Sequence, residues 1–226
     1  MARKTKEEAA VTRERMLTAA LDLFTEKGYS RTTLVDIAKR IGMTRGAVYW
    51  HFDGKPALLA ALMDHVHFLK EDWVESQIPD IQTLEDLRSA FILYARVVES
   101  DPVIRKFEFF LNYQMEWSEE LLAETQKKLN ELRKSPLENF RDYFEAPAIA
   151  VRLRPGVDLN QLVITLASFW CGACKMFLGR HCPGIEFGQR SDEDIQLLGG
   201  INLEQTIANG FDLIMCGVLK EESGDE

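Results

Sequence analysis

Apolar residues recur at helical spacing through most of the chain, and alternating β patterns are nearly absent. Between Val11 and Lys27 they form one stripe, made of Met16, Leu17, Ala20, Leu21 and Phe24. Gly28 then stands where a left-handed C-terminal cap is expected. The pattern predicts a first helix over Val11–Lys27.

A short second helix is expected over Leu34–Ile41, with Thr33 as its N-cap. Gly42 and Met43 form a tight break, and Thr44 can cap a third helix that runs to about Trp50. A fourth helix starts near Lys55–Pro56 and ends before Pro79, since proline suits a first helical turn.

The rest of the chain continues the helical pattern. Further helices are expected at Leu84–Ser100, Val103–Tyr113, Glu119–Phe144, Leu159–Arg180 and Leu203–Leu219. Pro136 should kink or split the third of these. The expected loops are Asp101–Pro102, Ala146–Asp158 and Cys182–Gly200. Nine or ten helices without a sheet give an all-α fold.

Residues 33–52 meet the requirements of a helix-turn-helix, which needs two short helices joined by a sharp turn. Its core-facing residues are Leu34, Ile37, Ala38, Ile41, Val48 and Phe52. The other face of the second helix carries Thr44, Arg45, Gly46, Ala47, Tyr49, Trp50 and His51. Arg45 can bind guanine O6 and N7 in a major groove, and Ala47 can touch a thymine methyl.

The flanks of this motif suit contacts with the DNA backbone. Thr33 and Thr44 offer hydroxyl and backbone N–H groups to phosphates, and Tyr49, His51 and Lys55 are spaced to reach the backbone beside them. The competing interpretation is that the aromatic residues only fill the core of a small three-helix bundle. We assign Phe52 to that core, whereas the role of Trp50 stays open between core and DNA.

The charge distribution agrees with a DNA-binding head. The 226 residues have a net charge of −9, but residues 1–56 hold 11 Lys and Arg against 7 Asp and Glu, a net charge of +4. The rest of the chain holds 16 against 29, a net charge of −13. A basic head on an acidic body is typical of a DNA-binding module joined to a domain that avoids DNA.

Other classes of protein have less support. No apolar run reaches the roughly 18–20 residues of a membrane helix, and the first residues lack the apolar centre of a secretory signal. The four cysteines do not form a disulfide framework, so we expect a cytoplasmic protein without a membrane role. We find no Gly-rich phosphate loop, catalytic metal motif or nucleophile elbow, and we expect neither an enzyme, a cofactor nor a metal.

The segments Gly28–Ala38 and Gly42–Phe52, followed by Lys55, closely resemble the TetR/AcrR family of transcriptional regulators. The opening residues, with Thr12 and Arg13, resemble the local repressors of multidrug efflux pumps within that family. The resemblance covers about 55 residues, and the remaining chain agrees in helical layout and length.

The resemblance implies a helix-turn-helix domain over residues 1–56 and a ligand-sensing and dimerisation domain over residues 57–226. It implies a homodimer that binds double-stranded palindromic operator DNA and is released by a small hydrophobic or aromatic inducer. The residues that would line the DNA are Thr33, Thr44, Arg45, Gly46, Ala47, Tyr49, Trp50, His51 and Lys55.

The predicted helix Leu159–Arg180 is apolar on two sides and must therefore be buried on two sides. Together with the last helix it could form a four-helix bundle with a second subunit, although burial inside a monomer is the alternative. The residues predicted for the dimer interface are Leu162, Leu166, Ala173, Phe177, Ile207, Phe211, Ile214 and Val218.

The middle helices are rich in aromatic residues, most of which must be ordinary core. Aromatics around a few polar groups are also what a promiscuous ligand pocket uses. The candidate ligand residues are His67, Phe91, Tyr94, Phe107, Glu108, Phe110, Leu111, Asn112, Gln114, Phe140, Phe144, Phe169 and Trp170.

Trp170–Lys175 reads W-C-G-A-C-K, which resembles a thioredoxin active site. That chemistry needs a strand before the first cysteine and a helix that starts at it, whereas Cys171 is predicted in mid-helix. A second alternative is thiol or zinc sensing by Cys171 and Cys174. His181 and Cys182 could complete the zinc site only if the chain folds back after the helix. Buried structural cysteines are the simpler interpretation. A helical interaction protein without a DNA role is the third alternative, and it leaves the helix-turn-helix unexplained.

Overall fold

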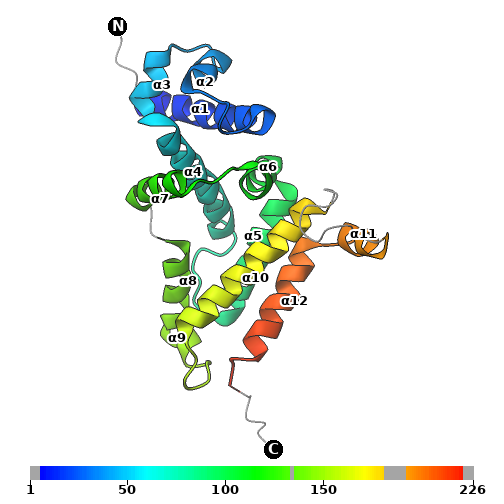
Figure 1. Cartoon of the computed structure of the whole chain (residues 1–226). Coiled ribbons are helices and arrows are strands. Elements are labelled where there is room, and N and C mark those ends of the chain that lie inside the picture. The colour runs from blue at the N-terminus through cyan, green and yellow to red at the C-terminus, as the bar shows by residue number, and fades with distance from the viewer. Residues whose placement is uncertain (1–5, 133–134, 181–191, 221–226) are drawn as a thin grey trace, which may run out of the picture. The chain divides into compact units, whose positions relative to one another are not determined.

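The computed structural model describes residues 6–132, 135–180 and 192–220, and over these residues the chain is helical without a β-strand (Figure 1). The all-α prediction is confirmed. The chain divides into two compact units. The first comprises Met1–Leu69 and Lys106–Arg133, and the second comprises Lys70–Arg105 and Lys134–Glu226. The domain division at residue 56 stays a prediction.

The first unit is built on α1, which α2 contacts on one side (Figure 1). Its helices are α1 (Lys6–Lys27), α2 (Leu34–Arg40), α3 (Arg45–His51), most of α4 (Gly54–Glu75), the end of α6 (Pro102–Phe109), the π-helix η1 (Phe110–Gln114) and α7 (Glu119–Leu132). Its core includes the fully buried Met16, Leu17, Phe24, Ile37, Val48, Leu58, Leu59 and Leu62. Burial of these apolar side chains is the main term that stabilises so small a unit.

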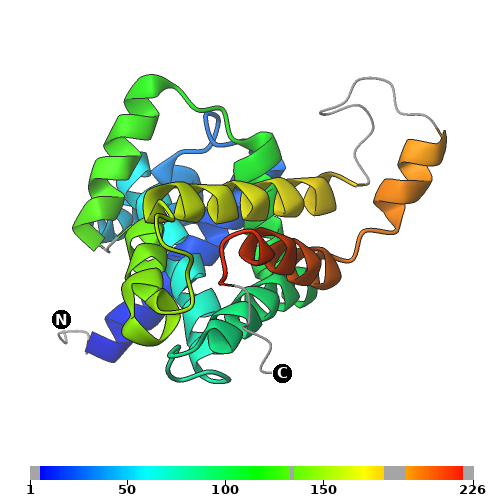
Figure 2. The ribbon, with the colours of Figure 1, turned by 90° about the horizontal axis from the view of Figure 1, so that it is seen from below.

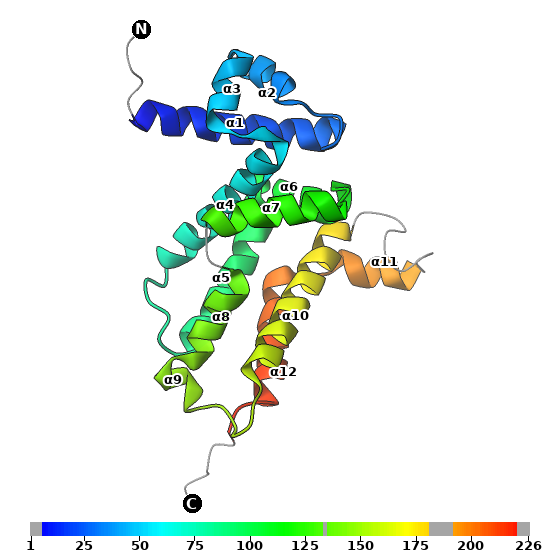
Figure 3. The same ribbon diagram turned by 60° about the vertical axis from the view of Figure 1, so that its left-hand side comes forward.

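The second unit contains α5 (Leu84–Ser100), α8 (Pro136–Glu145), α9 (Pro147–Ala150), α10 (Leu159–Gly179), α11 (Asp192–Gly199) and α12 (Leu203–Cys216). α12 packs against α5 and α10, and α10 also packs against α8. Figures 2 and 3 show α10 and α12 side by side, and they run in opposite directions. Two bidentate ion pairs, Arg88–Asp212 and Arg96–Glu204, join α5 to α12.

Several helix boundaries differ from the predicted ones. α1 begins at Lys6 rather than Val11, because Glu7 and Glu8 suit a first turn but carry no apolar periodicity. The predicted helix Val103–Tyr113 is two elements, α6 and the π-helix η1. The predicted helix Glu119–Phe144 is split into α7 and α8, and Pro136 is the first residue of α8.

Two of the predicted loops contain short helices. The segment 146–158 holds α9, and the segment 182–200 holds α11, while residues 181–191 lie outside the described part of the chain. The last helix ends at Cys216, before Val218. Leu153 and Leu219 instead form an isolated antiparallel bridge.

α10 is long and apolar enough to cross a membrane by length and composition, which corrects the expectation that no segment is. Buried core helices of soluble proteins pass the same test. In this chain α10 packs against both α8 and α12, so its apolar character has a structural cause within the second unit.

Candidate nucleic-acid interface and sensing domain

The turn between α2 and α3 has the sharp geometry of a helix-turn-helix. Gly42 adopts φ +71°, a left-handed conformation that favours glycine. The Met43 amide donates to the Ala38 carbonyl at 2.8 Å, which satisfies the end of α2. α2 and α3 are therefore held in a fixed relation within the first unit.

Both predicted N-caps are confirmed. The Thr33 hydroxyl accepts from the Asp36 amide at 3.1 Å, and the Asp36 carboxylate accepts from the Thr33 amide at 3.0 Å. This capping box lowers the pKa of Asp36, chiefly through the hydrogen bond that the Thr33 hydroxyl donates to the carboxylate. Thr44 caps α3 by accepting from the Ala47 amide at 3.3 Å. The caps set where each helix begins.

The outward face of α3 carries large exposed side chains. Trp50 is 76% exposed and Tyr49 is 47% exposed, while Val48 and Phe52 are buried as predicted. The Arg45 guanidinium lies over the Tyr49 ring, 4.9 Å from its centroid. Exposure of these aromatic rings to water is unfavourable, so this face of α3 is suited to be covered by a partner.

Lys55 has a structural role that the sequence did not indicate. Its ammonium donates to the carbonyls of Tyr29 at 2.8 Å and Ser30 at 3.2 Å, and it lies 4.3 Å from the centroid of the Tyr29 ring. Burial lowers the pKa of Lys55. Burial also raises the pKa of Tyr29 to about 12, with a smaller contribution from the charge of Glu124. Lys55 thus ties the start of α4 to the turn after α1.

Phe110, one of the predicted ligand residues, lies in the core of the first unit. It is fully buried and stacks on Phe24 of α1, with ring centroids 5.5 Å apart. An ion pair between Lys106 and Asp22 joins the same segment to α1. Phe110 is buried there because it is the first residue of η1, which packs against α1.

The other predicted ligand residues are divided between the units. His67, Phe107, Glu108, Leu111, Asn112 and Gln114 belong to the first unit. Phe91, Tyr94, Phe140, Phe144, Phe169 and Trp170 belong to the second unit. Their assignment to a ligand site stays a prediction.

Four of the predicted residues of the second unit form an aromatic cluster. Phe91 lies at its centre, with its ring centroid 5.2 Å from that of Phe140 and 6.1 Å from that of Trp170. Tyr94 extends the cluster, 6.4 Å from Trp170. Phe211 joins it, 5.2 Å from Phe91. Such rings offer stacking surfaces to an aromatic ligand.

Most of the residues predicted for the dimer interface lie on the inner faces of their helices. Six of them are buried within the single chain, namely Leu162, Leu166, Ala173, Phe177, Ile207 and Phe211. A side chain that its own subunit already covers has no surface left for a partner. Ile214 and Val218 are half-buried, and Val218 lies beyond the end of α12.

The outward faces of α10 and α12 carry a different apolar set. This interface stripe consists of Ile164, Cys171, Met176, Leu213 and Cys216, all of which are exposed. Leu213 is 77% exposed and Ile164 is 51% exposed. The spacing places Ile164 and Cys171 on one face of α10, and Leu213 and Cys216 on one face of α12, whereas Met176 lies about 120° around α10 from Ile164. α10 is therefore apolar on two sides, and the residues predicted for the interface lie on its inner side.

The cysteine pair lies in mid-helix, as predicted. Cys171 is exposed and Cys174 is buried, both within α10 and far from its first turn. Within the described residues, no group of three or more His, Cys, Asp or Glu could hold a metal ion. His181 and Cys182 lie outside the described residues. Thiol or zinc sensing gains no support from this arrangement.

Known proteins resemble this chain along most of its length. Residues 16–62 match the family described as bacterial regulatory proteins, tetR family. The chain is 32% identical to the HTH-type transcriptional regulator TtgR of Pseudomonas putida over 219 residues, which cover 95% of this chain and 96% of TtgR. The chain belongs to the TetR family.

Solved structures of TetR-family proteins agree. NalD, described as the secondary repressor of the MexAB-OprM multidrug efflux pump in Pseudomonas aeruginosa, matches with a TM-score of 0.70 and 26% identity. The match covers 96% of this chain and all of NalD. SmeT of Stenotrophomonas maltophilia shares the fold, with a TM-score of 0.64 over 92% of this chain and 91% of SmeT. TtgR and NalD are described as a transcriptional regulator and a repressor.

Proposed function

We propose that this protein is a cytoplasmic repressor that binds a palindromic operator as a homodimer, is released by a small hydrophobic or aromatic inducer and controls a multidrug efflux operon. The observation that carries the proposal is the exposed face of α3, which lies in a helix-turn-helix of a chain that matches TtgR almost end to end. The descriptions of NalD and SmeT as repressors of multidrug efflux pumps support the target.

The operator-binding residues of this proposal are those on and beside α3. They are Thr33, Thr44, Arg45, Gly46, Ala47, Tyr49, Trp50, His51 and Lys55. The structure refines two of them. The Thr33 hydroxyl already donates to Asp36, and two of the three Lys55 N–H groups already meet carbonyls. We therefore assign base reading to Arg45 and positioning to Thr33 and Lys55.

The homodimer forms through the interface stripe of α10 and α12. A two-fold axis would bring the stripe of one subunit onto the same stripe of its partner, which buries exposed apolar side chains such as Leu213 and Ile164 twice over. The result is a four-helix bundle with two helices from each subunit.

The inducer site of this proposal includes the aromatic cluster of the second unit. Triclosan is an apt first probe, because SmeT has been solved as a triclosan complex and shares this fold. Triclosan has two aromatic rings, which suit stacking on Tyr94 and Trp170, the half-buried members of the cluster.

One titration tests both halves of the proposal. Fluorescence anisotropy of labelled DNA from upstream of the protein's own gene should show specific binding that triclosan reverses. With about three ionic phosphate contacts in each half-site, the slope of log affinity against log salt should be about −5. A slope near zero would overturn operator binding. If the protein binds the operator tightly and a high concentration of triclosan does not release it, only the inducer assignment is overturned.

Arg45→Ala should weaken operator binding by about 1–3 kcal/mol, because one bidentate guanine contact is lost. The variant should also lose its preference for guanine at that one position. The measurement is anisotropy on a set of operators that differ at one base pair each. Lys55→Ala serves as the comparison, since it should lower the thermal stability of the first unit and weaken all operators alike. Uniform weakening by Arg45→Ala would contradict base reading by this residue.

A further inference from the structure

Arg45, the first residue of α3, is held by a side chain of the same helix. Its guanidinium carbon lies over the Tyr49 ring, 4.9 Å from the ring centroid, and its Nη2 donates to the Tyr49 hydroxyl at 3.4 Å. Residues four positions apart are neighbours on a helix surface, so α3 itself brings the two side chains together. A cation within about 6 Å of a ring centroid is attracted by the electrons of the ring face. Arg45 therefore has a preferred position before any DNA is bound.

The pair lies on the outward face of α3 and has a fixed base. Arg45 and Tyr49 are exposed, whereas Val48, next to Tyr49 in the chain, is fully buried and anchors the helix in the core of the first unit. Thr44 caps the first turn by accepting from the Ala47 amide. The backbone beneath the pair is thus fixed at both ends, and the face that carries the pair is the one that the proposed function turns to the DNA.

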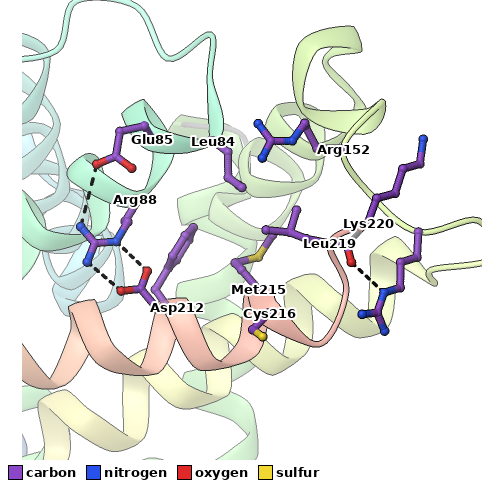
Figure 4. Close-up of a pocket in the computed structure, with 11 residues that line it drawn as sticks. Leu84, Glu85, Arg88, Arg152, Asp212, Met215, Cys216, Leu219 and Lys220 are labelled. Carbon is purple, nitrogen blue, oxygen red and sulfur yellow. Dashed lines mark hydrogen bonds and ion pairs between the residues drawn. The ribbon is translucent and has the colours of Figure 1, made fainter. Parts of the chain in front are cut away.

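A ring orders a guanidinium without occupying the groups that read a base. The attraction to a ring face needs none of the five N–H donors of a guanidinium, and a bidentate contact with guanine needs two of them. Arg88 shows the other way of ordering an arginine. It lines the pocket of the second unit drawn in Figure 4 and donates there to both carboxylate oxygens of Asp212, at 2.6 and 2.7 Å. A base could reach such an arginine only by displacing the carboxylate.

We propose that Tyr49 is a positioning residue that sets the base preference of this protein through Arg45. The inference rests on the proposed function, since it requires Arg45 to read guanine. A long side chain loses conformational entropy when it is fixed on a base, and the loss is smaller when the side chain is already held in the free protein. A tyrosine that only met a phosphate with its hydroxyl would strengthen binding to every sequence alike.

Base discrimination separates these two roles. The probes are labelled DNA from upstream of the protein's own gene and a second DNA in which the guanine read by Arg45 is replaced in both half-sites. Arg45→Ala identifies that guanine, because the variant loses its preference there. Fluorescence anisotropy gives the ratio of the two dissociation constants for the wild type, Tyr49→Leu and Tyr49→Phe. Leucine removes the ring and the hydroxyl, whereas phenylalanine keeps the ring. Since Tyr49 is 47% exposed, both variants leave the core of the first unit intact.

Tyr49→Leu should lower the preference for guanine about threefold in each half-site, hence about tenfold in the dimer, because an exposed cation–π contact is lost in each subunit. Tyr49→Phe should keep the preference, while the loss of a phosphate contact by its hydroxyl would weaken binding to both DNAs equally. In an Arg45→Ala background, Tyr49→Leu should leave the ratio unchanged, because the residue through which Tyr49 acts is absent.

Trp50→Leu is the matched control. It removes an exposed aromatic ring from the same helix, and that ring packs on His51 with 4.7 Å between the centroids. The control should keep the preference for guanine. An equal loss of preference in Trp50→Leu, or a loss in Tyr49→Phe, would overturn the proposal. A preference that survives Tyr49→Leu overturns this inference alone, whereas a wild type without any preference for guanine overturns base reading by Arg45 and this inference with it.

Discussion

Leu213→Glu is expected to turn the dimer into a monomer and to abolish tight operator binding. Leu213 is 77% exposed in the single chain, so the substitution leaves the core of the second unit intact. In a two-fold interface each substitution counts twice, and burial of one leucine contributes about 1.5–3 kcal/mol. Losing two such contributions should raise the dimer dissociation constant by at least about a hundredfold. Buried glutamates would add a desolvation cost.

Sedimentation equilibrium measures the association, and operator anisotropy measures the consequence for DNA. Leu122→Glu is the matched control, because Leu122 is a leucine that is 52% exposed on α7 of the first unit and does not belong to the interface stripe. The control should stay dimeric and bind the operator normally. A Leu213→Glu protein that remains dimeric at micromolar concentration would remove α12 from the proposed interface.

Local signals made the helix-turn-helix predictable. Thr33 and Thr44 were recognisable as N-caps because a hydroxyl just before an apolar periodic run satisfies an orphan amide. Gly28 was recognisable as a left-handed cap, and its φ is +88°. Such features depend on residues three or four positions apart, so the sequence contains all the information that they need.

The faces of α10 and α12 were not predictable in the same way. An apolar pattern on two sides of a helix indicates that both sides are covered in the functional protein. It does not indicate which side packs inside the subunit and which side faces a partner. Phe211 was predicted for the interface, yet it packs on Phe91 of α5. That choice depends on contacts across more than a hundred residues of sequence, which periodicity does not encode.

The other failures have the same origin. η1 requires a one-residue change of helical register, and no pattern in Phe110–Gln114 marks it. The structural role of Lys55 was not predictable, because one of the carbonyls that it meets lies 25 residues away in the sequence.

Gly210 of α12 is buried beside the Phe169 ring of α10. A Cβ added there would overlap the Phe169 ring, so one of the two helices or the ring must shift. At Gly46 of α3, in contrast, a Cβ would meet nothing within 4 Å. Comparing an alanine substitution at each glycine therefore separates the destabilisation caused by overpacking from the helix stabilisation that any glycine-to-alanine change brings.

Gly210→Ala is expected to lower the free energy of unfolding by about 1–3 kcal/mol, because overpacking outweighs the roughly 1 kcal/mol that alanine contributes to helix propensity. Urea denaturation followed by circular dichroism gives the value. In a Phe169→Ala background the clash is absent, and the same substitution should stabilise the protein. Gly46→Ala should be neutral or stabilising. If Gly210→Ala has the same effect in both backgrounds, Phe169 does not set the spacing of α10 and α12. If Gly210→Ala destabilises the wild type but stabilises the Phe169→Ala variant, the two positions are coupled, and Gly210 sets the distance between α10 and α12 through Phe169. The interface stripe lies on these two helices.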